Sequence, residues 1–214
     1  MIHPKHLDGN LIRLVQMEVQ HLCALETIAS NPIIWQNLPV EGWRKDSFWR
    51  WAYDSLELQK NGQAFVFVVI DQNSDKIVGT TRFQDMDRQH NKTDIGWTWY
   101  EPTVWGLGHN FEAKKMMMTH AFEVWNVARI GFKVDERNLR SQRALEKIGA
   151  SREGIIRKHM IRPDGTSRNS VLYGMTDEDW LLNVQLKPQF SMAEDTVEQR
   201  NNEKAGKNMV LARA

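Results

Sequence analysis

Apolar and polar positions along this chain follow two different periods, and the changes of period divide it into helices and strands. Apolar residues spaced three and four apart predict amphipathic helices, at 18–29, 47–60, 111–127 and 139–148. Short runs rich in β-branched and aromatic residues predict strands, at 11–15, 64–70, 76–83, 93–100, 128–134, 152–161 and 167–175. A hydroxyl followed by three acids at 176–179 predicts the start of a last helix.

The order of these elements predicts how the strands pair. The three consecutive strands between 64 and 100 predict an antiparallel meander. The strand 93–100, the helix 111–127 and the strand 128–134 predict one right-handed crossover between parallel strands. We therefore expect an α/β (α+β) fold, with a mixed, mostly antiparallel twisted sheet of about seven strands and helices on both faces.

Composition adds a domain plan. The chain has 214 residues, of which 41% are hydrophobic, enough for the core of one domain. We expect an N-terminal extension over 1–9 and the folded domain over 10–186. From 187 to 214 the chain becomes polar and charged, which predicts a flexible tail.

Charge and cysteine usage exclude several classes of function. A net charge of +1 gives no electrostatic reason to expect a nucleic-acid or membrane partner. The single cysteine, Cys23, excludes an intrachain disulfide and a cysteine-based zinc cluster, and we expect no metal. No apolar run approaches the roughly 18 residues of a membrane helix, and the N-terminus has no signal-peptide pattern. We therefore expect a cytoplasmic protein.

The loop between the strand 93–100 and the helix 111–127 carries the strongest chemical signal. Pro102, Gly106 and Gly108 form a glycine-rich turn before a helix start. The first N–H groups of a helix have no partner within the helix, and the helix dipole adds positive potential there, so such a turn can bind a phosphate. Phe111 occupies the third glycine position of a dinucleotide fingerprint, and no P-loop motif is present. A plain turn is the alternative.

Several short motifs together resemble the GNAT acetyltransferase superfamily. They are Gly106-x-Gly108, Asn138-x-x-Ser141 and the run from Glu146 to Ala150. Further short motifs resemble the RimJ/RimL-like branch, which is named for acetylation of ribosomal-protein N-termini. They are Ile95-Gly96-Trp97, Glu112-Ala113-Lys114, Glu153-Gly154 and Pro163-Asp164-Gly165. The resemblance covers about residues 10–182.

This resemblance implies a site for acetyl-CoA. The fourth and fifth strands would splay apart, and the pantetheine arm would pair with the backbone beside Trp99 and Tyr100. Asn138 would hold the pantetheine as well. Backbone amides would bind the pyrophosphate, from Gly106, Leu107, Gly108, His109, Asn110 and Phe111. Thr103 departs from the Arg or Gln that relatives often have three residues before the first glycine.

The resemblance also implies direct attack of a neutral amine on the thioester. A backbone N–H near Trp99 or Tyr100 would bind the oxyanion, with Gly96 marking a bulge in that strand. Leu145 stands where many relatives have a tyrosine, so Ser141 is the expected proton donor to the thiolate. Asp94 is the candidate base. Other carboxylates nearby, or a water chain to solvent, stay open as alternatives.

An acceptor pocket is expected between the loop 33–45 and the third strand. Trp35, Arg82 and Phe83 are the candidate contacts, because aromatic walls with one basic group suit an amine-bearing ligand. The alternative is that the tryptophans of this region pack the helices onto the sheet.

The sequence therefore predicts an N-acetyltransferase that moves an acetyl group from acetyl-CoA to a protein N-terminus or a small amine. The alternatives are a regulatory domain that binds acetyl-CoA without catalysis, and a structural protein of the same fold. The acceptor is not defined by the sequence, and a homodimer stays open.

Overall fold

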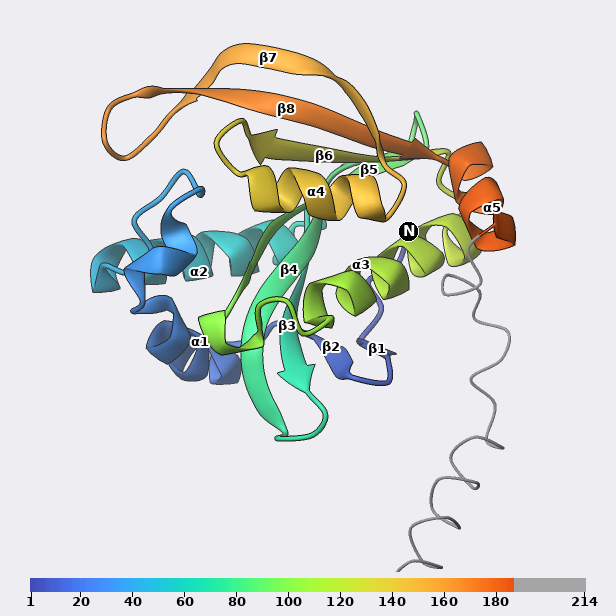
Figure 1. Ribbon diagram of the computed structural model, residues 1–214. Coiled ribbons are helices and arrows are strands. Elements are labelled where there is room, and N and C mark those ends of the chain that lie inside the picture. Colours follow the sequence, from blue (N-terminus) through green and yellow to red (C-terminus); the bar gives the residue numbers. More distant parts are fainter. Residues whose placement is uncertain (187–214) are drawn as a thin grey trace, which may run out of the picture. The chain divides into compact units, whose positions relative to one another are not determined.

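A computed structural model describes residues 1–186, and the compact unit that carries the sheet spans Met1–Asp179. Its eight strands form one sheet in the order β1-β2-β3-β4-β5-β6-β8-β7 (Figure 1). The strands are β1 (His6–Asp8), β2 (Ile12–Gln16), β3 (Phe65–Asp71), β4 (Lys76–Asp87), β5 (Lys92–Tyr100), β6 (Arg129–Asp135), β7 (Ser151–Ile161) and β8 (Ser167–Thr176). Only β5 and β6 pair in parallel, and all other neighbours are antiparallel. The predicted fold class is confirmed.

The sheet has one strand more than the sequence pattern indicated. β1 lies within residues 1–9, which the sequence reasoning treated as an extension, and it pairs with β2 from His6↔Val15 to Asp8↔Arg13. A three-residue strand is too short to show a two-residue period, so pairing with β2 rather than local pattern defines it.

Five α-helices accompany the sheet in the described residues. They are α1 (Leu22–Ala29), α2 (Lys45–Lys60), α3 (His109–Thr119), α4 (Leu139–Lys147) and α5 (Asp177–Leu186). α3 begins two residues earlier than the pattern predicted, because Gly108 is its N-cap, and it continues into a π-helical turn at His120–Val124. None of the helices in residues 1–186 is long and apolar enough to cross a membrane.

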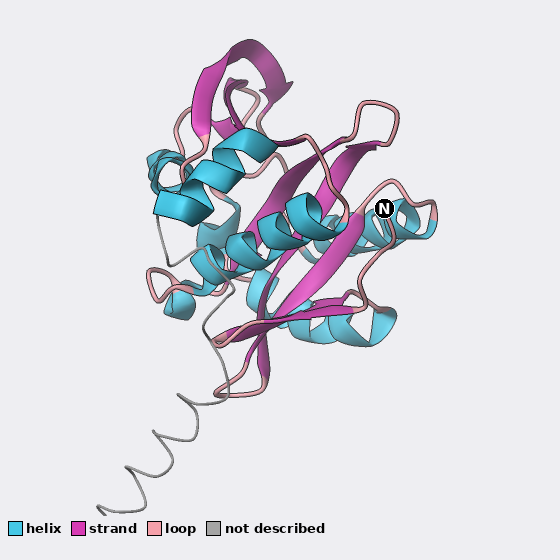
Figure 2. Ribbon diagram, turned by 90° about the vertical axis from the view of Figure 1, so that its right-hand side faces the viewer, coloured by secondary structure: helices cyan, strands magenta, loops and turns pink. Residues whose placement is uncertain are grey.

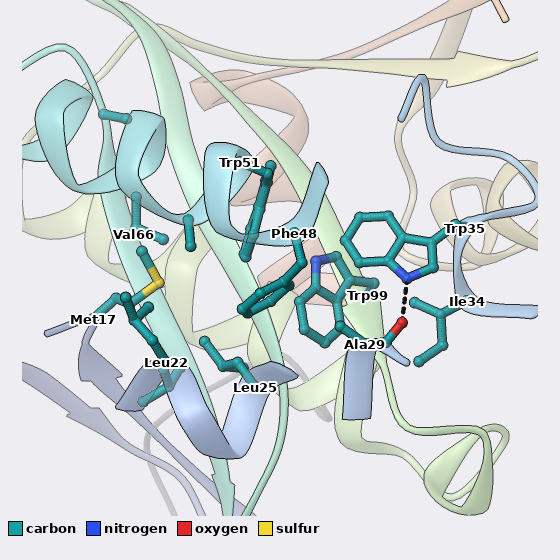
Figure 3. Close-up of a cluster of buried hydrophobic side chains, with 13 residues drawn as sticks. Met17, Leu22, Leu25, Ala29, Ile34, Trp35, Phe48, Trp51, Val66 and Trp99 are labelled. Atoms are coloured by element: carbon teal, nitrogen blue, oxygen red, sulfur yellow. Dashed lines mark hydrogen bonds between the residues drawn. The ribbon is translucent and has the colours of Figure 1, made fainter. Parts of the chain in front are cut away.

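Helices lie on both faces of the sheet, as expected (Figure 2). α1 and α2 contact each other and the strands β4 and β3, whereas α3 contacts β1 and β2 from the opposite face. Between α1, α2 and the sheet lies a buried apolar cluster that includes Leu22, Leu25, Phe48, Trp51 and Trp99 (Figure 3). This cluster fixes one side of β5 and so positions the strand whose other side faces the site.

β5 and β6 separate after a short parallel stretch. They pair only from Lys92↔Arg129 to Asp94↔Gly131, although β5 continues to Tyr100 and β6 to Asp135. A strand edge without a strand partner leaves backbone N–H and C=O groups available. From Ile95 onward, the edge of β5 that faces β6 is therefore a place where an extended ligand can pair.

A β-bulge interrupts β5 in this same stretch. The register with β4 shifts between Thr80↔Trp99 and Arg82↔Gly96, so β5 has one extra residue there. Trp97 has φ +48°, a left-handed conformation that is uncommon for a bulky residue. The expected bulge is present one residue after Gly96, and it turns the backbone near the open edge of the strand.

The predicted tail at 187–214 lies outside the described residues.

Candidate functional site

A cavity of about 330 Å³ opens where β5 and β6 separate. Its walls come from β5, from the loop that follows it, from the first turns of α3, from α4 and from the loop between α1 and α2. The lining residues are Ile34, Asn37, Leu38, Thr98, Trp99, Tyr100, Val104, Trp105, Gly106, Gly108, Asn110, Phe111, Lys114, Asn138, Arg140, Ser141, Ala144, Lys147 and Ile148. Three segments distant in sequence, 34–38, 98–114 and 138–148, therefore meet at this cavity.

The glycine-rich loop forms one end of the cavity. Gly106 has φ +79° and Gly108 has φ +96°, conformations that strain any residue with a Cβ. Nothing lies within 4 Å of the position that a Cβ on Gly106 would occupy, so the backbone there is open to a ligand. Gly108 is the N-cap of α3 and has no side chain with which to cap it. The helix start therefore faces the cavity, and the unpaired N–H groups of such a start can bind an anion.

The six residues predicted for this loop divide into two groups. Gly106, Gly108, Asn110 and Phe111 line the cavity, as a phosphate cradle requires. The side chain of Leu107 is 62% exposed, and the ring of His109 is buried with its Nε2 2.9 Å from Asp71 Oδ2. For Leu107 and His109, a role in binding rests on the backbone alone.

β5 supplies the second wall through Thr98, Trp99 and Tyr100. The indole of Trp99 turns into the apolar cluster, with ring centroids 5.4 Å from Trp35 and 5.6 Å from Trp51 (Figure 3). Only the backbone of Trp99 is then suited to a ligand. The hydroxyl of Tyr100 is buried without a hydrogen-bond partner in residues 1–186, and burial raises its pKa.

α4 forms the opposite wall. Asn138 is its N-cap, and the side-chain oxygen accepts a hydrogen bond from the Ser141 N–H at 3.1 Å. Both residues line the cavity, one turn apart. Leu145 is 2% exposed and packs in the hydrophobic core. The capping role of Asn138 thus coexists with its position at the site.

Every ionisable side chain in the lining is basic apart from Tyr100. Lys114, Arg140 and Lys147 line the cavity, and no Asp, Glu or His does so among the described residues. The Arg140 guanidinium lies 3.8 Å from the centroid of the Trp105 ring, which links α4 to the glycine-rich loop. Three cations without carboxylates favour a polyanionic ligand.

Asp94 lies away from this cavity. It pairs with Gly131 where β5 and β6 are still joined, and its Oδ2 is 2.8 Å from the Lys133 ammonium. It is not part of the lining in the described structure. The sequence placed Asp94 on the right strand but could not show that the strand opens only after it.

The predicted acceptor residues do not share one surface. Trp35 is 3% exposed, and its Nε1 donates to the Ala29 carbonyl at 2.7 Å (Figure 3). Arg82 lies near Ser55 of α2 and beneath the Trp97 ring, whereas Phe83 is fully buried against Phe67. Adjacent strand residues point to opposite faces of a sheet, so the side chains of Arg82 and Phe83 do not lie on one face. The neighbours of Trp35 reach the cavity instead, through Ile34, Asn37 and Leu38.

Lys114 is one of the lining residues that sequence reasoning missed as site residues, along with Arg140 and Lys147. It is 8% exposed on α3, and its Nζ donates to Asn110 Oδ1 at 2.8 Å. Burial lowers the pKa of Lys114 to about 8. The available signal was a lysine four residues after Asn110 and two residues before the apolar run Met116–Met118.

Known proteins share sequence and fold with this chain. The family model described as an acetyltransferase (GNAT) domain matches residues 12–151. The chain is 29% identical over 103 residues to p20, an uncharacterized N-acetyltransferase of Bacillus licheniformis, which covers 48% of this chain and 57% of that protein. It is 28% identical over 129 residues to the ribosomal protein uS5 alanine N-acetyltransferase of Escherichia coli, covering 58% and 63%.

Solved structures share the fold. A GCN5-related N-acetyltransferase from Brucella melitensis matches with a TM-score of 0.79 and 23% identity, over 92% of this chain and 91% of that one. The microcin C7 self-immunity acetyltransferase MccE, solved in complex with acetyl-CoA and AMP, matches with a TM-score of 0.70 and 18% identity, over 78% and 93%. The sequence matches to both curated relatives span less than two thirds of their length.

Proposed function

Because this chain belongs to the GNAT acetyltransferase family, we propose that it transfers the acetyl group of acetyl-CoA to a primary amine. The observation that carries the proposal is the cavity itself. It joins a glycine-rich helix start, an unpaired strand edge and three cations in one place. A pantetheine arm with a phosphate at one end is complementary to these features, because its amides can pair with the strand edge and its phosphate can bind the helix start and the cations.

The residues present fit acetyl-CoA. The open backbone at Gly106 and the uncapped start of α3 suit the pyrophosphate, through amides from Gly106 to Phe111. The free edge of β5 near Trp99 and Tyr100 suits the pantetheine, which carries amide groups that can pair with a strand. Asn138, opposite, adds a side-chain amide. The related structure of MccE with acetyl-CoA supports the same cofactor.

Acetyl-CoA, when bound, supplies an acetyl group activated as a thioester. The chain contributes the groups around that thioester. An N–H of the bulged segment of β5, near Trp99, binds the oxygen that becomes negative, because donors fixed in advance stabilise developing charge. Ser141, on the wall formed by α4, donates a proton to the departing sulfur.

No acid or histidine in the described lining can serve as the base. The amine therefore reaches the cavity neutral, or loses its proton through water, which was the open alternative to Asp94. Asp94, ion-paired with Lys133, instead keeps the two strands together below the opening. We propose this positioning role for it.

The acceptor is proposed to be a protein N-terminus or a small amine. The relative that acetylates the N-terminal alanine of a ribosomal protein favours the first. Ile34, Asn37 and Leu38 present an apolar and amide surface to the cavity, which suits a peptide end. We also propose that the protein acts in the cytoplasm, where ribosomal acceptors are found.

One panel of assays tests the function and its alternative. Isothermal titration with acetyl-CoA should show binding, and release of free thiol should accompany addition of an accepting amine. The amines are peptides with different N-terminal residues, alanine among them, and small amines. Binding without thiol release from any acceptor would favour the regulatory alternative, and absence of binding would reject both.

A further inference from the structure

The ammonium group of Lys114 is buried inside the proposed cofactor cavity with little to compensate its charge. The side chain is 8% exposed and lines the cavity from the second turn of α3. An ammonium group has three donors, and one of them meets Asn110 Oδ1 at 2.8 Å. No ion pair in residues 1–186 includes Lys114. A buried charge without a counter-ion is costly, so this one calls for an anion.

The groups that face Lys114 across the cavity reinforce this need. β5 presents Tyr100, which is neutral, and α4 presents Arg140 and Lys147, which are positive. The loop at 102–108 carries no ionisable side chain, and neither do the residues that the α1–α2 loop contributes. His109, at the start of α3, is turned away toward Asp71. In the described structure, no negative group comes from any of these walls.

The direction of the side chain shows which part of a ligand it meets. Asn110 lies in the first turn of α3, so the hydrogen bond to Asn110 draws the ammonium group back toward the helix start. The helix dipole and the first-turn N–H groups favour an anion there. Thr103 leaves the preceding loop without a cation, and Lys114 can supply that charge from the helix side.

We propose that Lys114 binds a phosphate group of acetyl-CoA through its ammonium group and takes up a proton as the cofactor enters. This inference rests on the proposed function, since it assumes that acetyl-CoA occupies the cavity. The lowered pKa of about 8 means that part of the population is neutral near pH 8. A bound phosphate stabilises the ammonium form and raises that pKa again.

The first experiment measures affinity by isothermal titration at pH 7.5. Acetyl-CoA should bind Lys114→Gln roughly 10- to 100-fold more weakly than the unaltered protein, as expected for loss of a charged hydrogen bond. Lys115→Gln, the neighbouring lysine outside the cavity lining, should bind normally. Acetyl-pantetheine, which has no phosphate, should bind all three proteins equally.

The second experiment follows the proton. Titrations at pH 8.5 in buffers of different ionisation enthalpy should reveal proton uptake on binding, and Lys114→Gln should lose it. Affinity should fall as the pH rises from about 7.5 to 9.5, because the free protein loses the proton through that range while the bound form keeps it. The acylated sulfur does not titrate, and phosphate monoesters titrate near pH 6, below this window. Lys114→Arg should keep affinity without proton uptake.

The outcomes separate this inference from the function it rests on. If the unaltered protein does not bind acetyl-CoA, the proposed function fails. The inference alone fails if the unaltered protein binds acetyl-CoA and Lys114→Gln binds it equally well. It also fails if Lys114→Gln still takes up a proton on binding. An equal loss of affinity for acetyl-pantetheine would assign Lys114 a structural role. Acetylation of Lys114, seen by mass after incubation with acetyl-CoA, would place the amine at the thioester and overturn it.

Discussion

Single residues in this protein are defined by backbone conformation and by burial more than by residue type. Gly106 and Gly108 occupy left-handed conformations at the edge of the cavity. A lysine on a helix is usually solvent-exposed, but Lys114 is buried in a cavity whose other ionisable residues are Tyr100, Arg140 and Lys147. The same residue type can therefore be a solvated side chain at one position and a candidate binding group at another.

Gly106→Ala tests whether a ligand approaches the backbone of the loop. The added Cβ has open space in the free protein, so the cost in stability should be about 1 kcal/mol of backbone strain. Acetyl-CoA affinity should nevertheless fall at least tenfold, because the Cβ occupies the place of the ligand. Gly62→Ala is the matched control: Gly62 has φ +69° and open space, but lies outside the cavity lining. Equal affinities in the two variants would contradict the cradle.

Gly108→Val is a stronger test at the second glycine. Gly108 has φ +96°, and a β-branched residue there both strains the start of α3 and crowds the anion site. We expect acetyl-CoA binding to be abolished while the circular dichroism spectrum remains that of the folded protein. Normal binding by this variant would reject the loop as the pyrophosphate site.

Ser141→Ala tests the proposed proton donor. The turnover number should fall about 100-fold with acetyl-CoA affinity unchanged, because the hydroxyl acts on the leaving sulfur and not in binding. Ser47→Ala is matched to it, since Ser47 occupies the third position of α2 as Ser141 does of α4. Steady-state kinetics measures both variants, and an unaltered turnover number in Ser141→Ala would remove Ser141 from the mechanism.

Helices and strands acquire their function here from what they are anchored to. The start of α3 is held by Glu112, whose carboxylate accepts backbone N–H bonds from Asn10, Leu11 and Ile12 at 2.7–2.8 Å. The turn between β1 and β2 is thereby fixed to the helix whose first turns line the cavity. α4 is fixed in its turn by the cap that Asn138 provides.

Glu112→Ala should lower the free energy of unfolding by roughly 3 kcal/mol, because three N–H groups lose a charged acceptor. Urea unfolding followed by fluorescence measures this change. Glu57→Ala, on the exposed face of α2, should stay within about 0.5 kcal/mol. A loss no larger in Glu112→Ala than in this control would mean that the turn is held by other contacts.

The sheet as a whole is joined at its β6–β8–β7 end by a buried ion pair. Arg162 donates to Asp135 Oδ2 through Nε and to Oδ1 through a terminal nitrogen, both at 2.8 Å. Burial by itself raises the pKa of Asp135, but the hydrogen bonds from Arg162 and the Arg137 N–H, together with the charges of Arg162 and Arg168, outweigh it and hold that pKa below its usual value. A lowered carboxyl pKa stabilises the folded state above about pH 4, and that stability is lost as the pH falls further.

Asp135→Asn should therefore cost roughly 3–5 kcal/mol at pH 7, since it leaves the Arg162 charge buried without its partner. Its stability should also change less between pH 5 and pH 2.5 than that of the unaltered protein. Urea unfolding across this pH range measures both effects, with the exposed Asp54→Asn as control. A variant as stable as the control would show that the pair contributes nothing net.

Periodicity and local signals within the sequence determined most of the elements, their order and the glycine-rich loop. A helix or strand pattern depends on neighbours within a few residues, and so do the turn at Gly106–Gly108 and the cap at Asn138. The meander and crossover followed from element order, because connection rules leave few topologies. The extra strand β1 did not follow, because three residues carry no period and only their pairing with β2 defines them.

Tertiary structure alone decided which side chains reach the cavity. A two-residue period places Arg82 and Phe83 on opposite faces, but only packing shows that Phe83 and Trp35 are core residues. The point at which β5 leaves β6 excludes Asp94 from the lining, and no local pattern marks that point. Lys114 became a binding candidate because segments far apart in the chain bury it in a cavity whose lining, among residues 1–186, contains no carboxylate. Charge and desolvation are properties of the folded arrangement, which the sequence specifies only through the fold.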